Sequence, residues 1–205
     1  MNSKDKIIKK FDLSYEQVKK IDLFINEIKI YNTHTNIVGK STLQNPWNRH
    51  VLDSLQLLKF IKKKNTSILD LGAGAGIPGI FLAIANQNNI SLVDASLKKI
   101  KFMRNAANVL NLNVKIYHNR IEKIKNLKFK YLISRALANL NKLFFYSQNL
   151  MKKDTVLIFL KGRTVSEEIN EAKLKWTFNY KAYDSLSDKY GKILMIKNLK
   201  KKWPK

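Results

Sequence analysis

The segment Ser67–Ile80 reads SILDLGAGAGIPGI, and the rest of the chain can be placed around it. An apolar run that ends in a carboxylate is followed by glycine at every second position, and a proline then opens a second apolar run. This pattern predicts a strand over Ile68–Leu71, a tight turn, and a helix over Pro78–Ala85. Glycine suits such a turn because it tolerates positive φ and because a side chain would hold a ligand off the main chain. We therefore predict that a ligand lies against the bare backbone of the turn, at Gly72, Gly74 and Gly76.

Two ligands compete for this turn. The shorter pattern Gly74–Gly79 also fits the G-x-G-x-x-G of dinucleotide-binding enzymes, so an NAD-dependent oxidoreductase is one alternative. A pyrophosphate, however, would lie close to the carboxylate of Asp70, and like charges at short range repel. S-adenosylmethionine (SAM) carries a sulfonium and an ammonium group and no phosphate. Asp94 ends the next predicted strand, where an acid commonly accepts hydrogen bonds from ribose hydroxyls. The sequence thus favours SAM, with Asp70 and Asp94 at the edge of the pocket.

Composition limits the remaining possibilities. A chain of 205 residues, 45% of them hydrophobic, can form one α/β domain with a short extra piece. Its net charge of +24 indicates a polyanionic partner, although a general preference for Lys and Asn would raise the charge too. The chain has no cysteine, which excludes a thiolate metal site and a thiol nucleophile. The longest uncharged apolar run, Ile77–Ala85, is too short to span a bilayer, so we expect a cytoplasmic protein without a membrane partner.

The residues before the glycine turn predict two helices. A capping box begins at Ser14, and apolar residues recur at helical spacing up to Ile28. The segment Tyr31–Gln44 has no clear period and is predicted to be an ordered loop. A second helix is expected from Pro46 to about Ile61, because Asn45 can cap it and proline suits its first turn.

Three polar residues share one turn of that second helix. Arg49 and Asp53 have the spacing of an i,i+4 ion pair, and His50 lies between them. This cluster is either a solvated surface pair or a polar edge that faces the cofactor or substrate, which makes His50 a weak catalytic candidate. The other histidines have no carboxylate cluster around them, so the sequence predicts no metal site.

From Ser67 onward, short apolar runs alternate with helical patterns, which is typical of βαβ units and a parallel sheet. The predicted strands are Ile68–Leu71, Ile90–Asp94, Val114–Tyr117, Tyr131–Ser134 and Val156–Lys161, followed by a hairpin of Trp176–Tyr180 and Lys192–Ile196. The predicted helices are Pro78–Ala85, Leu97–Leu110, Leu137–Met151 and Val165–Lys173. We predict one α/β domain, with a helical extension over 1–64, a core over 65–197 and a frayed basic tail over 198–205, beginning near Lys197, that could touch RNA.

Further candidate residues follow the later strands. Arg135 comes directly after the fourth strand, whose carboxyl end borders the ligand crevice of an open α/β sheet. An arginine there needs an anionic or polar partner, so Arg135 is either the leading active-site residue or half of a structural ion pair. Lys161 has a similar position after the fifth strand and is a weaker candidate. Ile121 and Glu122 follow the third strand and could flank an adenine, or could simply start a helix.

The residue types that the chain lacks limit which atoms of a base it could methylate. Methylation of pyrimidine C5 needs a thiolate, and the chain has no cysteine. The Asn/Asp-Pro-Pro-aromatic loop that usually serves exocyclic amino groups is replaced by Ser134-Arg135-Ala136. A ring nitrogen such as guanine N7 carries a free lone pair and no proton, so its methylation requires alignment rather than a general base.

Six motifs occur in a characteristic order along the chain. They are Arg49-His50-x-x-Asp53-Ser54, Asp70-x-Gly72-x-Gly74-x-Gly76-x-Pro78-Gly79, Asp94-Ala-Ser-x-x-Lys99, Arg120-Ile-Glu122, Ser134-Arg135-Ala136 and Leu160-Lys161-Gly162. In this the chain resembles the bacterial glucose-inhibited division protein B family, whose members are 16S rRNA guanine-N7 methyltransferases. The resemblance covers nearly the whole chain, from about Asn36 to the final hairpin.

The resemblance implies a class I SAM-dependent methyltransferase (Rossmann-like) fold and a mostly parallel seven-stranded sheet with a C-terminal antiparallel hairpin. It also implies that SAM contacts Gly72, Ile77, Ile121, Glu122 and Arg135, and that the partner is 16S rRNA or the small ribosomal subunit. We expect a monomer. The alternatives are the NAD-dependent oxidoreductase and a basic rRNA-binding assembly factor without catalytic activity.

Overall fold

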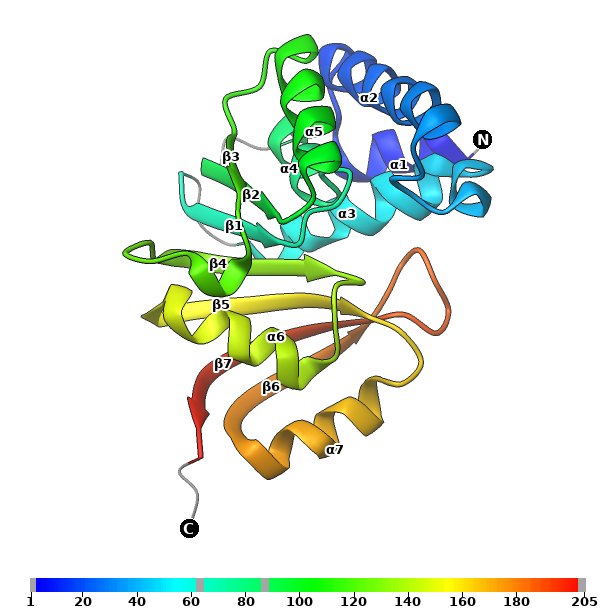
Figure 1. The fold of residues 1–205 in the computed structure, drawn as a ribbon. Coiled ribbons are helices and arrows are strands. Elements are labelled where there is room, and N and C mark those ends of the chain that lie inside the picture. The colour runs from blue at the N-terminus through cyan, green and yellow to red at the C-terminus, as the bar shows by residue number, and fades with distance from the viewer. Residues whose placement is uncertain (1–2, 62–64, 86–88, 203–205) are drawn as a thin grey trace.

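A central sheet organises the molecule. The computed structural model of the chain describes residues 3–61, 65–85 and 89–202. Its seven-stranded sheet has the order β3-β2-β1-β4-β5-β7-β6 (Figure 1). The strands are β1 Ser67–Leu71, β2 Asn89–Asp94, β3 Lys115–His118, β4 Phe129–Arg135, β5 Met151–Lys161, β6 Trp176–Asp184 and β7 Lys192–Lys201. Strands β3, β2, β1, β4 and β5 are parallel, whereas β7 is antiparallel to β5 and β6. The predicted mostly parallel sheet with a final hairpin is therefore confirmed.

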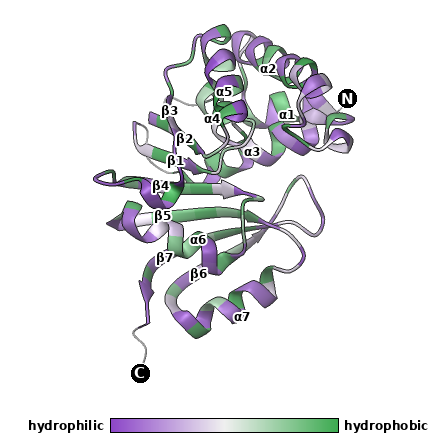
Figure 2. Cartoon of the chain, viewed as in Figure 1, coloured by the Kyte–Doolittle hydropathy of each residue, from purple (hydrophilic) through white to green (hydrophobic). Residues whose placement is uncertain are grey.

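Helices cover both faces of this sheet, and each face has its own apolar core. One layer contains α4 Gly79–Ala85 and α5 Leu97–Val109, and the other contains α6 Leu140–Ser147 and α7 Val165–Lys175. In β1, Ile68 belongs to the first core, whereas Leu69 and Leu71 belong to the second. Alternate residues of a strand point to opposite faces, so a central strand must be apolar on both. Figure 2 shows the hydrophobic colour over the middle of β4 and β5.

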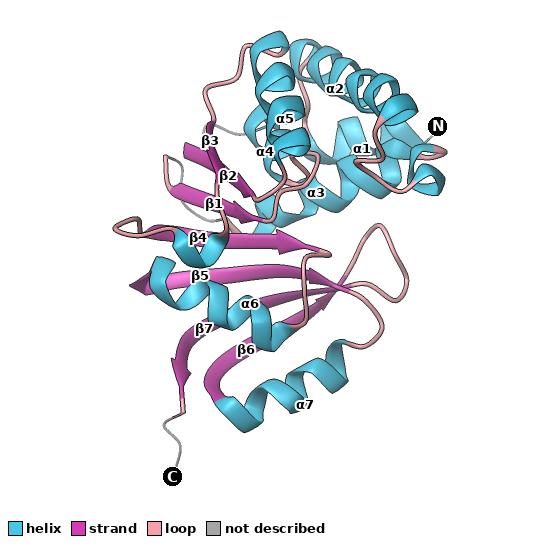
Figure 3. Cartoon of the chain, in the orientation of Figure 1, coloured by secondary structure: helices cyan, strands magenta, loops and turns pink. Residues whose placement is uncertain are grey.

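The N-terminal helices join the first of these layers, beside α4 and α5 (Figure 3). The predicted capping box at Ser14 is present at the start of α2 Tyr15–His34. The helix α1 Ser3–Phe11 was not predicted, and α2 continues into the segment expected to be a loop. Tyr31 packs against Phe102 there with ring centroids 4.9 Å apart. This contact with α5 explains why α2 extends beyond its regular apolar period.

The second predicted helix is present but is not one regular helix. It consists of a π-helical segment Trp47–Leu52, the short α3 Asp53–Leu55 and a 3-10 segment Gln56–Phe60. Such π-helical turns are rare and occur often at functional sites. The predicted pair of Arg49 with Asp53 is wrong, since both side chains pair with residues far along the chain. Arg49 pairs with Asp188 and Asp53 pairs with Arg135.

The C-terminal segment corrects the prediction of a basic tail. Strand β7 continues to Lys201, so the lysines that were expected to fray belong to the sheet. They pair with β6, where Lys200 lies opposite Thr177 and Lys201 opposite Trp176. Leu199 is buried in the second core, which holds this end of the strand in place. The last residues of the predicted tail, 203–205, lie outside the described residues.

Candidate functional site

The glycine turn after β1 has the conformation that the sequence predicts. Gly72, Gly74 and Gly76 have φ values of 64°, 61° and 82°, in a region that other residues rarely adopt. A Cβ at Gly72 would overlap the side chain of Leu137, with Cδ2 only 2.9 Å away. The turn is thus left-handed at three alternate positions, and the main chain at Gly72 has no room for a side chain.

Asp70 lies under the turn rather than at the edge of a pocket. Its carboxylate is fully buried, and Oδ2 accepts a hydrogen bond of 2.9 Å from the backbone N–H of Gly79. Its Oδ1 has no partner among the described residues. Burial raises the pKa of Asp70 from 3.8 to about 7, opposed by the hydrogen bond from Gly79 and by the charge of Arg135. The prediction that Asp70 edges the ligand pocket is therefore wrong, and its carboxylate holds the turn to the start of α4.

Asp94 does border a cavity, at the end of β2. Its Oδ2 accepts the N–H of Gly74 at 2.9 Å, and its Oδ1 accepts the N–H of Ser96 at 2.8 Å. The adjoining cavity of about 320 Å³ is also lined by Gly72, Ile121 and Glu122. A carboxylate has about four acceptor positions, so Asp94 can still accept hydrogen bonds from a ligand. Four predicted site residues thus surround one cavity.

A second cavity of about 180 Å³ lies on the other side of Gly72. Gly72, Lys99 and Ala136 line both cavities, which therefore adjoin each other. The second cavity adds four further predicted site residues, namely His50, Gly74, Ile77 and Arg135. Gly76 lines neither cavity and is buried within the turn. Eight of the predicted site residues thus line these two cavities, whereas Asp70, Gly76 and Lys161 line neither of them.

Arg135 occupies the centre of the site, at the end of β4. Its Nη1 donates hydrogen bonds of 3.0 Å to the carbonyl oxygen of Arg49 and to Oδ2 of Asp53. Burial lowers the pKa of Arg135 below its ordinary value, whereas the charge of Asp53 and its hydrogen bond act in the opposite direction. The side chain is only 20% exposed and lines two cavities. Arg135 therefore combines the ion pair and the position in the crevice that the sequence offered as alternatives.

His50 contacts Arg135 from the π-helical segment. Its side chain is buried, and Nδ1 lies 3.0 Å from Nη2 of Arg135. Burial lowers the pKa of His50 from 6.5 to about 3, with further lowering by the charges of Arg135 and Arg49. A guanidinium can only donate, so Nδ1 accepts and the ring proton is on Nε2. Nε2 is buried and has no partner among the described residues.

A third cavity, of about 420 Å³, opens beyond Arg135 at the ends of β4 and β5. It is lined by Lys161 and Arg163 on one side and by the loop between β6 and β7 on the other. The ammonium of Lys161 donates to the carbonyl oxygen of Ala138 at 2.9 Å and pairs with Glu168 at 2.6 Å. Lys161 thus has a structural role in holding the chain after β4 against α7.

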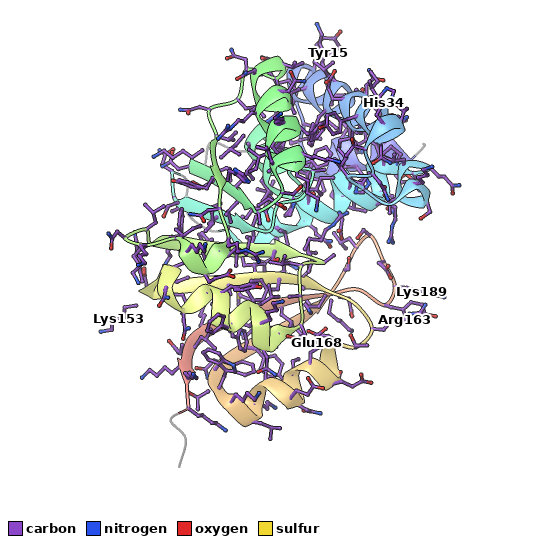
Figure 4. All side chains as sticks on the ribbon, viewed as in Figure 1. Tyr15, His34, Lys153, Arg163, Glu168 and Lys189 are labelled. Atoms are coloured by element: carbon purple, nitrogen blue, oxygen red, sulfur yellow. The ribbon has the colours of Figure 1, made fainter. Side chains whose placement is uncertain are left out.

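The loop after β6 supplies the residues that the sequence did not reveal. Asp188 pairs with Arg49, and Tyr190 stacks under the guanidinium of Arg163 at 3.7 Å from the ring centroid. Figure 4 shows Arg163 and Lys189 at the same edge of the molecule. The sequence offered only a polar turn with one aromatic residue before Gly191, because these contacts join residues far apart in the chain.

The described part of the chain holds neither a cluster of metal ligands nor a helix that could cross a membrane. Its His, Asp and Glu side chains form no group of three or more that could share a metal ion. None of the helices in residues 3–61, 65–85 and 89–202 is long and apolar enough to cross a membrane.

The chain matches a known protein family over most of its length. Residues 17–199 match the family GidB, described as rRNA small subunit methyltransferase G. The chain belongs to this family. The ribosomal RNA small subunit methyltransferase G of Rickettsia prowazekii (strain Madrid E) is 41% identical over 186 residues, which cover 91% of this chain and 96% of that protein. The corresponding protein of Rickettsia akari (strain Hartford) is 38% identical over 190 residues, covering 93% and 98%. The resemblance found in the motifs is confirmed.

Solved structures with little sequence identity share the fold. A SAM-dependent methyltransferase from Aquifex aeolicus superposes with a TM-score of 0.59 at 16% identity, covering 76% of this chain and 95% of that one. A mutant of MtNAS in complex with S-adenosylmethionine has a TM-score of 0.59 at 16% identity, covering 88% and 71%. The predicted fold class, the methyltransferase activity and SAM as the cofactor of this GidB family member are confirmed.

Proposed function

We propose that this chain transfers a methyl group from SAM to N7 of a guanine in 16S rRNA. The observation that supports the proposal most strongly is the meeting of three cavities at Arg135 and Ala136. Ala136 lines all three cavities, and Arg135 lines two of them. A cofactor on one side of these residues and a nucleotide on the other would face each other across them, and both relatives named above carry rRNA methylation in their names.

The two smaller cavities fit the cofactor. A cationic ligand suits their backbone floor and the carboxylates of Asp94 and Glu122, and Ile121 offers an apolar wall for an adenine. Asp94 would accept hydrogen bonds from the ribose hydroxyls, while Gly72, Gly74 and Ile77 would lie along the methionine portion. SAM supplies the methyl group when it is bound there. His50 and Arg135, in the second cavity, present N–H groups suited to a carboxylate.

The largest of the three cavities fits the methyl acceptor. Arg163 and Tyr190 offer a cationic and an aromatic surface to a nucleotide, as in other sites for single-stranded RNA. Guanine N7 has no proton to lose, so the site requires no general base. His50 matches this requirement, because its low pKa keeps it neutral and its Nδ1 is engaged by Arg135. The residues around the acceptor would orient the base and bind phosphate.

The charge of the protein bears on the substrate it acts on. The net charge of +24 supports a polyanionic substrate, either free 16S rRNA or RNA in the small ribosomal subunit. We propose a monomer in the cytoplasm.

The test is transfer of labelled methyl from SAM to 16S rRNA that lacks the modification, followed by mapping of the labelled nucleoside. We expect the label in 7-methylguanosine. Label at another atom would refute the proposed N7 chemistry, and RNA binding without transfer would favour the catalytically inactive assembly factor.

A further inference from the structure

A cleft on the described residues lies away from the candidate site. Strands β5 and β7 pair only from Leu157–Lys161 to Lys192–Ile196. Beyond that ladder β7 stays paired with β6, and Figure 1 shows both strands curving away from β5. The cleft, of about 770 Å³, opens where the strands part. The cleft lies at one end of the β5–β7 ladder, and the opposite end of the ladder borders the acceptor cavity.

The walls of this cleft carry lysines on both sides. On β5, Lys152 and Lys153 belong to a bulge between Met151 and Val156, whose sheet partners are Phe129 and Tyr131. The bulge is fixed by the hydroxyl of Thr155, which accepts the N–H of Lys152 at 2.7 Å and donates to the carbonyl oxygen of Phe129 at 2.6 Å. Lys200 and Lys201 of β7 form the facing wall. The lysines are exposed, but their backbones are held in the sheet.

The charged residues that line the cleft are all lysines. No Asp or Glu occurs among the described residues that line it. The neighbouring acid, Asp154, pairs with Lys130 at 2.6 Å, and this hydrogen bond lowers the pKa of Asp154. The floor includes Trp176, which is buried, and the side-chain amides of Asn179 and Asn198 border the opening. Lysines on a backbone held in the sheet, with neighbouring amide groups and no competing acid, suit a polyanion with closely spaced charges.

We propose that this cleft is a second binding site for the rRNA, which holds the phosphate backbone far from the methylated base. The inference rests on the proposed function only for the identity of the RNA. Lys152 and Lys161 lie near the two ends of β5, roughly 30 Å apart at about 3.3 Å per residue. Figure 4 shows Lys153 on the opposite side of the molecule from Arg163 and Lys189. The enzyme therefore recognises an extended or folded piece of RNA rather than the target nucleotide alone.

The test compares the affinity of two doubly substituted proteins for unmodified 16S rRNA over a series of salt concentrations. Lys152→Glu with Lys200→Glu reverses one charge on each wall of the cleft. We expect at least a tenfold loss of affinity at about 0.1 M salt, and a slope of log affinity against log salt that is smaller by roughly 1.5, since each phosphate contact contributes about 0.7–0.9. Filter binding measures this without methyl transfer, so the result does not depend on whether the proposed reaction is correct.

Lys19→Glu with Lys29→Glu is the matched control, because it makes the same change of charge on the exposed surface of α2. We expect less than a threefold loss for this protein, and unchanged SAM affinity for both, which also reports that they are folded. An equal loss of rRNA affinity in the two proteins would assign the effect to net charge and overturn the proposal. Unchanged affinity and slope in the cleft variant would overturn it as well.

Discussion

Arg135 is the residue whose replacement tests the site most directly. It binds Asp53, the carbonyl oxygen of Arg49 and the ring of His50 at the border of the cofactor and acceptor cavities. We expect Arg135→Ala to lower kcat at least tenfold, or about 1.4 kcal/mol in the barrier, because cofactor and base lose a common orienting group. Single-turnover methylation of 16S rRNA at saturating SAM measures this effect.

Arg135→Lys separates charge from geometry at the same position. Lysine keeps the positive charge but has no planar fork that could reach Asp53 and His50 together, so we expect an intermediate rate. Rates near those of the unmodified protein for both variants would assign the Arg135–Asp53 pair to the fold alone.

We expect the burial of Asp70 to make the free energy of unfolding depend on pH. Its pKa is raised from 3.8 to about 7, so between these values the folded protein keeps a proton that the unfolded chain has released. The contribution of Asp70 to stability therefore falls as the pH rises from about 4 to 7 and is constant above 7. Asp70→Asn removes this titration and can still accept the N–H of Gly79. We expect its stability relative to the unmodified protein to rise through that window by up to about 4 kcal/mol.

Urea unfolding at a series of pH values measures the difference. Parallel curves for the two proteins from pH 4 to 8 would mean that Asp70 ionises in the folded protein as readily as in the unfolded chain. The order of residues places Asp70 beside the glycines, which is why the sequence suggested the edge of the pocket. Strand alternation instead puts its side chain on the same face as Ile68, beneath the turn.

At the level of elements, we expect cofactor binding to depend on the turn between β1 and α4. Gly72→Ala places a methyl group at a residue with φ of 64° and against Leu137, which lines the same cavity. We expect at least a tenfold loss of SAM affinity in calorimetry, because Leu137 must move into the space of the ligand. Gly162→Ala is the control, since no atom lies within 4 Å of its added Cβ. Equal SAM affinity in the two variants would remove the cofactor from this turn.

The elements themselves were largely predictable, whereas the contacts between distant loops were not. Apolar periodicity predicted a strand at each of the described strands, most clearly in the middle of the sheet, where β1, β2, β4 and β5 are buried over most of their length. It missed the end of β7, where lysines alternate with few apolar residues and only pairing with β6 defines the strand. It also missed Asp188 and Tyr190, since no local pattern marks a loop that is held by Arg49 and Gln56 from the other end of the chain.

For the molecule as a whole, the two apolar cores share one sheet, which leads us to expect a single cooperative unit. Phe24 of α2 is fully buried, with its ring centroid 5.0 Å from that of Phe81 and 6.2 Å from that of Phe102. Through these rings the N-terminal helices pack on α4 and α5 and thus on the sheet. The predicted extension over 1–64 would then unfold together with the core over 65–197, not separately.

Phe24→Ala tests this cooperativity. We expect the free energy of unfolding to fall by about 3–5 kcal/mol, because a large cavity forms between α2, α4 and α5. Hydrogen exchange of the amides in β5, which pairs with β4 and β7, should report the same loss of unfolding free energy as urea unfolding followed by circular dichroism. The neighbouring substitution Leu23→Ala is the control, since Leu23 is 37% exposed and should cost less than about 1 kcal/mol. If exchange in β5 were unchanged in Phe24→Ala, the N-terminal helices would unfold on their own, and residues 1–64 would form a separate unit.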